Sequence, residues 1–298
     1  MSCPPKTNEE SYEFFDNIED YIKKAKSAES TAASSNTDSI CDSFMKSSRT
    51  GFKEIITANR ICKEYMNLYY SINELRSNLN SDPRYKKCRE FLNYWINIKF
   101  RENMNNEYDC VHDVYDALES HITGIGDHYV NLFFIYDINK DDMYKMNILY
   151  SLYEKYIKLK TIIESTLEQK KQVLPLSTEC CTDFVQAKYI CKDDKNNGST
   201  FCKKLESFET KYKMLYPKFE AKRSEFSDSL IKLEECSNTK IITAAFTPMG
   251  QMFRSKIGVL NNDISNNDEE MTKISSMEHD NEPLRFQKGT YNIKYQSV

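Results

Sequence analysis

The sequence predicts an all-α protein with one multi-helix domain and a disordered C-terminal tail, and three observations carry this prediction. Only seven glycines and seven prolines occur among 298 residues, too few for the many tight turns of a β-sandwich or β-barrel. Apolar residues recur at steps of three and four over most of residues 41–236, the period of an amphipathic helix. From residue 241 onward the chain is rich in asparagine and acidic residues with few spaced apolar ones, a composition typical of disorder.

Residues 1–40 are expected to form a short helix and a flexible connector ahead of the domain. The helix is indicated by four apolar residues with helical spacing: Tyr12, Phe15, Ile18 and Ile22. Residues 27–39 are rich in Ser, Ala and Thr, a composition typical of flexible connectors. We therefore place the start of the folded domain at residue 41.

The segment 41–80 is predicted to be helical because it carries a regular apolar seam. The seam alternates steps of four and three: Ile61, Tyr65, Leu68, Ile72, Leu75 and Leu79.

The next helix contains the only tryptophan of the chain. Cys88, Leu92 and Trp95 share one face of this helix, which should lie in the core. Asp82 suits the N-cap and Pro83 the first helical turn, so we expect the helix to begin there.

Two further helices are predicted in the middle of the chain. The first covers residues 108–121 and is broken by Gly124 and Gly126. The second follows a polar, capping-type run at 137–142, extends for about 30 residues and ends before Pro175. Its seam is again spaced by three and four: Leu149, Leu152, Tyr156, Leu159, Ile163 and Leu167.

The last part of the domain is interpreted as a cysteine-rich region followed by a helix. Residues 177–203 hold four cysteines around a polar loop at 192–200, and the helical segment 201–235 is interrupted at Pro217. From the successive seams we choose seven candidates for the hydrophobic core: Leu68, Leu92, Trp95, Leu152, Tyr156, Leu159 and Ile163.

One segment resembles the start of a calcium-binding loop but fails the rest of the pattern. Asp137, Asn139 and Asp141 occupy the first three ligand positions. Asp142 stands where the loop requires glycine, and Ile148 stands where the bidentate glutamate must be. We therefore interpret the segment as a helix start.

No other motif indicates chemistry. Cys110, His112, His121 and His128 match no closed zinc site. The sequence contains no Gly-rich phosphate loop, no G-x-S-x-G and no H-E-x-x-H. We expect no catalytic residue, no cofactor and no bound metal.

Charge and hydropathy exclude two classes of partner. A net charge of -4 and a pI near 5.8 argue against a nucleic-acid-binding protein. The longest mostly apolar runs, 129–136 and 241–246, are far below the ~20 residues of a membrane span, and residues 1–15 do not read as a signal peptide. We expect this chain to lack a membrane span of its own and to be soluble.

Several segments carry a family resemblance. The stretch 88–97, Cys-Arg-Glu-Phe-Leu-Asn-Tyr-Trp-Ile-Asn, resembles the signature of the Vir branch of the PIR family, a variant multigene family of malaria parasites. Four other segments agree with it, in the family's order: Cys62 with Leu68-Tyr69-Tyr70, Asn106-Glu107-Tyr108-Asp109-Cys110, Phe246-Thr247-Pro248-Met249-Gly250, and Tyr291 to Ser297.

The resemblance implies an exported domain with a disulfide framework. Ten cysteines are many for a cytosolic protein of this size, and a mixture of buried thiols is the other interpretation. The candidate disulfide cysteines are nine: Cys41, Cys62, Cys88, Cys110, Cys180, Cys181, Cys191, Cys202 and Cys236. On this basis residues 41–236 are the helical, cysteine-rich PIR/Vir domain, and residues 237–298 resemble the family's cytoplasmic segment.

By resemblance, the function is that of a non-enzymatic variant surface antigen of blood-stage malaria parasites. Such proteins are exported to the infected red cell and are implicated in immune evasion and host-cell adhesion, so a host-cell receptor or an antibody is the expected partner. Exposed loops such as 192–200 would vary while the helical packing is kept. The alternative is an internal helical scaffold or trafficking protein that assembles with protein partners through helix faces; reduced cysteines would favour it.

The sequence departs from the family at one point. In the proteins it resembles, a membrane helix comes directly before the Phe-Thr-Pro-x-Gly motif, whereas here residues 236–245 run straight into Phe246. We hypothesise that this segment was lost by divergence, splicing or choice of gene model. The splicing version requires genomic DNA between the codons for Cys236 and Phe246 that encodes about 20 apolar residues.

Overall fold

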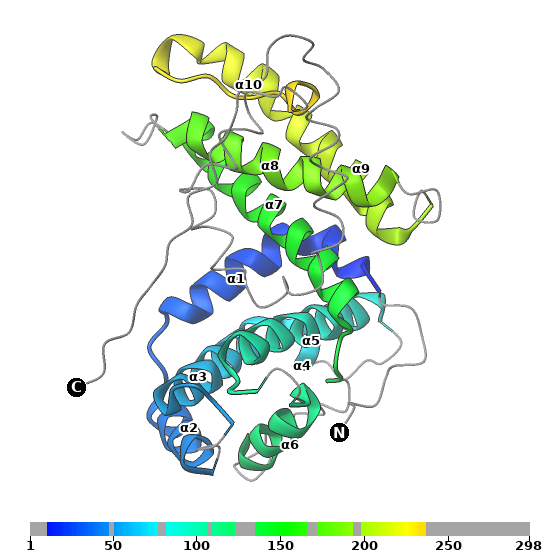
Figure 1. The fold of residues 1–298 in the computed structure, drawn as a ribbon. Coiled ribbons are helices and arrows are strands. Elements are labelled where there is room, and N and C mark those ends of the chain that lie inside the picture. Colours follow the sequence, from blue (N-terminus) through cyan, green and yellow to red (C-terminus); the bar gives the residue numbers. More distant parts are fainter. Residues whose placement is uncertain are drawn as a thin grey trace, which may run out of the picture. The chain divides into compact units, whose positions relative to one another are not determined.

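The described part of the chain is built from helices joined by turns and short extended segments (Figure 1). The computed structural model describes these residues: 11–47, 51–76, 82–106, 109–122, 135–165, 172–192 and 198–236. Within them no β-strand occurs, and a single β-bridge joins Phe52 to Met104. The predicted all-α, disulfide-supported fold is confirmed. The tail 237–298, predicted to be disordered, lies outside the described residues.

The helices follow one another along the chain with these bounds: η1 (Glu13–Asn17), α1 (Ile18–Ser30), α2 (Ser35–Ser47), α3 (Ile55–Ser71), α4 (Asn73–Arg76), α5 (Pro83–Asn103), α6 (Val111–Ile122), α7 (Lys140–Glu164), α8 (Val173–Lys192), α9 (Thr200–Lys213), α10 (Leu215–Ala221), η3 (Arg223–Glu225) and η4 (Leu233–Glu235).

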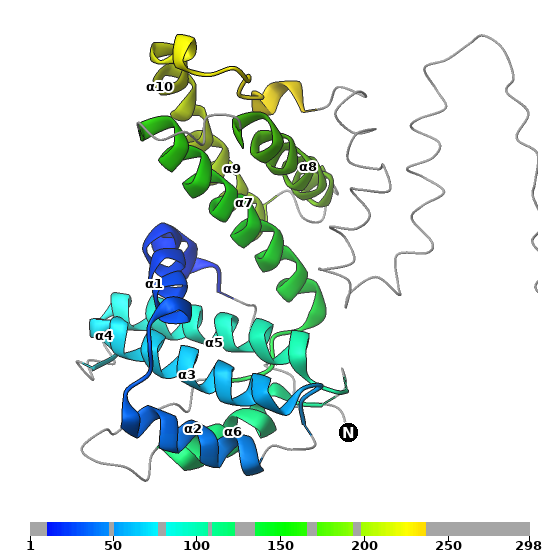
Figure 2. The same cartoon turned by 90° about the vertical axis from the view of Figure 1, so that its left-hand side faces the viewer.

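Two groups of helices share the N-terminal segment as a common neighbour. Helices α2 to α6 pack on one another, and helices α7 to α10 form the second group. η1 packs on α5 of the first group, and α1 packs on both α3 and α7, as Figure 2 shows for α1. The N-terminal segment is therefore part of the core and joins the two groups.

The predicted division at residue 41 cuts through this core. The largest side chains of η1 and α1 are almost completely buried: Phe14, Phe15, Ile18, Tyr21 and Ile22. The predicted flexible connector at 27–39 is wrong, because only residues 31–34 of it lie outside helices. Ala28 and Thr37 face the interior there, so tertiary packing outweighs the low helix preference of the Ser and Thr residues around them.

The two prolines that were expected to interrupt helices lie in first helical turns instead. Pro175 is the third residue of α8 and Pro217 the third residue of α10. Proline is tolerated there because the first N–H groups of a helix have no partner within it. The breaks fall elsewhere, since α7 ends at Glu164 after 25 residues and α9 gives way to α10 at Met214.

Helix α8 was not anticipated as a helix. It occupies most of the segment interpreted as a cysteine-rich region around a loop, and it buries one face against α7 and α9. The buried residues of that face are Val173, Ser177, Cys180, Cys181, Phe184 and Ala187. Two adjacent cysteines and several Ser and Thr residues obscure the apolar period of this face in the sequence.

All seven core candidates are buried, with exposed fractions from 0% to 5%. The Trp95 ring lies 6.3 Å from the Tyr65 ring, and the Lys99 ammonium lies 5.3 Å from the Trp95 ring centroid. Leu152, Tyr156, Leu159 and Ile163 form the inward face of α7. The helix seams of the sequence therefore correspond to the interior of the domain.

Candidate functional site

Helix α5 carries the 88–97 stretch and begins at the residues chosen from the sequence. The Asp82 side chain accepts a hydrogen bond from the backbone N–H of Arg84 at 2.8 Å, and Pro83 is the first helical residue. This capping bond satisfies one of the N–H groups that a helix leaves without partners at its start.

Two asparagines of this stretch fasten a distant extended segment, residues 135–139, to helix α5. Asn93 Oδ1 accepts a hydrogen bond from the backbone N–H of Tyr136 at 3.0 Å. Asn97 Nδ2 donates to the carbonyl of Tyr136 at 2.9 Å, and Asn97 Oδ1 accepts from the N–H of Ile138 at 3.1 Å. Both asparagines are at most 1% exposed. Their amides therefore replace water as the partner of backbone groups inside the domain.

Asp137, in the middle of the fastened segment, caps a helix that precedes it in the chain. Its carboxylate accepts hydrogen bonds from the backbone N–H groups of Val111 at 2.8 Å and His112 at 3.2 Å, the first residues of α6. The Arg101 guanidinium on α5 lies 2.8 Å from the same carboxylate. A negative charge at a helix N-terminus is favourable, so Asp137 joins α5 to α6 rather than forming a calcium loop.

Asn139 then starts the next helix. Its side chain accepts a hydrogen bond from the backbone N–H of Asp142 at 2.8 Å, as the capping-type run predicted.

Three disulfides connect neighbouring helices. Cys41–Cys62 joins α2 to α3, Cys191–Cys202 joins α8 to α9, and Cys181–Cys236 joins α8 to the residue after η4. Cys110 is also disulfide-bonded. Seven of the nine candidate cysteines are therefore bonded.

Cys88 and Cys180 correct the prediction, because both are free thiols in the interior. The Cys88 Sγ lies 3.3 Å from the Tyr21 hydroxyl oxygen, and the Cys180 side chain is completely buried. Burial raises the pKa of Cys88 to about 11 and raises the pKa of Cys180 as well. Because the thiolate is the reactive form, neither is suited to act as a nucleophile at neutral pH.

The described chain ends in a segment that we call the exit strap, residues 226–236. Between η3 and η4 it bends at residues 227–228 and forms no helix, and four of its side chains are buried: Phe226, Leu230, Leu233 and Cys236. The Phe226 ring lies 5.0 Å from the Phe219 ring of α10. The exit strap therefore packs as part of the domain and precedes the C-terminal residues.

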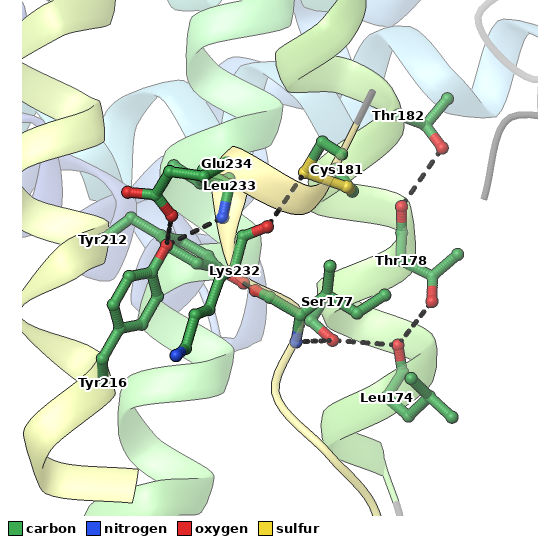
Figure 3. Close-up of a disulfide and its surroundings, with 12 residues drawn as sticks. Leu174, Ser177, Thr178, Cys181, Thr182, Tyr212, Tyr216, Lys232, Leu233 and Glu234 are labelled. Atoms are coloured by element: carbon green, nitrogen blue, oxygen red, sulfur yellow. Dashed lines mark hydrogen bonds between the residues drawn. A yellow bond between two sulfur atoms is a disulfide. The ribbon is translucent and has the colours of Figure 1, made fainter. Parts of the chain in front are cut away.

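Side chains from three helices bind the backbone of the exit strap (Figure 3). Ser177 of α8 accepts a hydrogen bond from the N–H of Ile231 at 3.3 Å, and Tyr212 of α9 donates to the carbonyl of Ile231 at 3.1 Å. Tyr216 of α10 accepts from the N–H of Leu233 at 2.7 Å. Burial raises the pKa of both tyrosines, so their hydroxyls stay protonated.

Sequence reasoning missed the five polar residues that fasten these two segments: Asn93, Asn97, Ser177, Tyr212 and Tyr216. A polar residue within an apolar helical seam was the only signal for them, and the sequence does not show which backbone group each one meets.

Two of the histidines make hydrogen bonds to other segments of the chain. His121 Nε2 lies 2.9 Å from Ser47 Oγ, and His112 Nδ1 lies 3.3 Å from the carbonyl oxygen of Ile135. His128 lies outside the described residues. Over the ranges that the structure describes, no three potential metal-ligating side chains are grouped, and none of the helices combines the length and apolar character needed to cross a bilayer.

The described residues therefore form a helical domain that is cross-linked by disulfides. Comparisons with protein-family models, with curated proteins and with solved structures find no match to this chain.

Proposed function

We propose that this chain is a non-enzymatic variant surface antigen of blood-stage malaria parasites, of the Vir branch of the PIR family. The disulfide framework is the observation that carries the proposal. Paired cysteines form and persist in exported proteins and are rare in cytosolic ones, and here they join helices of one domain in three places. The motif resemblance supplies the family, and the domain would be exported to the infected red cell.

The proposed mechanism is presentation of a variable surface on a constant scaffold. The buried amides of Asn93 and Asn97 and the disulfides hold the helices without using exposed side chains. The Cys191–Cys202 disulfide joins α8 to α9, and the flanking Lys192 and Gly198 are exposed, whereas residues 193–197 of the predicted loop lie outside the described residues. Substitutions at such exposed positions would change contacts with an antibody or host receptor while the core is retained.

The test is antibody staining of infected red cells with and without permeabilisation. The antibody is raised against folded residues 1–236, because the N-terminal segment belongs to the core. We expect signal on intact cells, blocked by the folded domain but less by the same domain reduced and alkylated. An antibody to a cytosolic protein controls for leaky cells. Signal only after permeabilisation would overturn the surface assignment and favour the internal helical scaffold.

A further inference from the structure

The exit strap is covalently joined to helix α8 at the residue where the described chain ends. Cys236 is bonded to Cys181, and 55 positions separate the two along the chain. Tension applied to the residues after 236 therefore reaches α8 through the disulfide and bypasses residues 182–235. Those residues include helix α9, helix α10 and most of the exit strap.

Without the disulfide, the exit strap would be held by contacts that a pull breaks one after another. The N–H of Leu233 binds Tyr216, and then the N–H and carbonyl of Ile231 bind Ser177 and Tyr212. These contacts follow each other along the backbone from the start of η4 back to residue 231, so a pull from the C-terminal side reaches them singly. Each such hydrogen bond is weak on its own.

Helix α8, in contrast, is held along its length. It forms the most extensive helix pair of the described residues with α7, and it also packs on α9. The partly buried ion pair between Lys155 and Asp183 joins α7 to α8 at 2.6 Å. A force delivered at Cys181 therefore acts on many contacts at once.

We propose that the Cys181–Cys236 disulfide is a tension clamp. It carries a pull on the C-terminal residues into the α7–α8 pair and keeps α9, α10 and the exit strap folded under that pull. The proposal goes beyond the antigen function, since it holds for whatever partner or anchor retains the C-terminal residues.

Single-molecule force spectroscopy on the full chain, held at its first and last residues, tests the clamp. The wild type is compared with C181S/C236S and with C181A/C236V, which keeps the site apolar. In the variants α8 remains packed on α7 as far as Cys191, and the Cys191–Cys202 disulfide passes the pull directly to Cys202, so the 34 residues from 203 to 236 are free to extend. We expect an early release at low force of about 115 Å, at roughly 3.4 Å per residue, which the wild type lacks.

The matched control is C191S/C202S, which removes a bridge from the same helices but outside the path of tension. We expect its release lengths to equal those of the wild type. The proposal is overturned if residues 203–236 of C181S/C236S and C181A/C236V extend together with the rest of the domain in one event. It is also overturned if both variants have lost their helical circular dichroism, because the bridge would then serve the stability of the whole domain.

Discussion

The side chain of Asn97 accepts a hydrogen bond from the backbone N–H of Ile138, 41 residues further along the chain. The same side chain donates to the carbonyl of Tyr136. One amide on α5 therefore sets the position of the extended segment that precedes α7. Because Asp137 in that segment caps α6, three helices depend on this contact.

Replacement of Asn97 by alanine should destabilise the domain by about 2–4 kcal/mol, because it removes the hydrogen bonds that the side chain makes to the buried N–H of Ile138 and to the carbonyl of Tyr136. Urea unfolding followed by circular dichroism measures the change. Asn103→Ala on the same helix is the control, since its amide binds only the Lys99 carbonyl of its own helix. A loss no greater than that of the control would contradict the role given to Asn97.

A protein that begins at residue 41 should not fold, whereas residues 1–236 should. The truncation removes six large buried side chains: Tyr12, Phe14, Phe15, Ile18, Tyr21 and Ile22. Each contributes about 1.5–3 kcal/mol when fully buried, so together they contribute about 9–18 kcal/mol, comparable to a typical net stability of ~5–15 kcal/mol. Thermal unfolding of both proteins checks this. A cooperative transition for residues 41–236 would show that the N-terminal segment is dispensable.

Acid should weaken the contacts between the N-terminal segment and its neighbours. Burial by itself would raise the pKa of Asp16 and Glu19, but hydrogen bonds from lysines outweigh burial and lower both: Lys204 and Lys87 for Asp16, and Lys211 and Lys160 for Glu19. A carboxylate whose pKa is lowered on folding stabilises the folded state when the pH is above its ordinary pKa, here 3.8 for Asp and 4.5 for Glu. This stabilisation is lost as the pH falls through the lowered pKa.

The double variant D16N/E19Q tests this pH dependence. It should be less stable than the wild type at pH 6, and the difference should shrink at pH 3, as read from urea midpoints. Asp20→Asn serves as the control, because Asp20 is 61% exposed and pairs with Lys24 of its own helix. Equal differences at both pH values for D16N/E19Q would refute the assignment.

Cys88 and Cys180 should not react with a thiol reagent in the native protein, and both should react once the protein unfolds. A rise in the pKa of Cys88 from 9.0 to about 11 lowers its thiolate fraction about 100-fold below pH 9, and burial blocks access further. A thiol reagent at pH 8 measures this with and without denaturant, in the absence of reductant. C88A/C180A should lower the denatured count by two thiols. An unchanged count would mean that these cysteines are bonded.

Alkaline pH should lower the stability of the folded protein through ionisation of the Cys88 thiol. Because the pKa of Cys88 is higher in the folded state, its stabilising effect is complete below the ordinary value of 9.0 and is lost as the pH rises through about 11. The stability of Cys88→Ala should therefore fall less steeply than that of the wild type between pH 9 and pH 11. Parallel slopes would contradict the burial argument.

Local chemistry explains which elements were predictable from the sequence. Asp82 and Pro83 located the start of α5, and the seam through Leu152 and Leu159 located α7, because capping and helical period depend on residues close together in the chain. The spacing of Tyr12 to Ile22 correctly predicted a helix there, but the place of α1 in the core and the existence of α8 depend on distant partners, so the sequence around them did not reveal either.

The partners of the residues that hold distant segments together could not be predicted from the sequence. Nothing near Asn97 indicates that its partner is the backbone of residues 136–138, and nothing near Cys181 indicates Cys236 rather than another cysteine. A polar residue in an apolar helix seam indicates that it has a hydrogen-bond partner, but only the three-dimensional structure identifies that partner.

The adjacent Cys180 and Cys181 impose an order on oxidative folding. In an unfolded chain Cys236 meets either neighbour equally well, since closure entropy differs negligibly between loops of 55 and 56 residues. Only the register of α8 separates them, because successive helical residues point about 100° apart and it is Cys181, with Cys180 left as a thiol, that meets Cys236 in the folded domain. The native bond must therefore form after α8, or be reached by isomerisation of a mispaired Cys180–Cys236 intermediate. The yield of refolding should depend on disulfide isomerase for this reason.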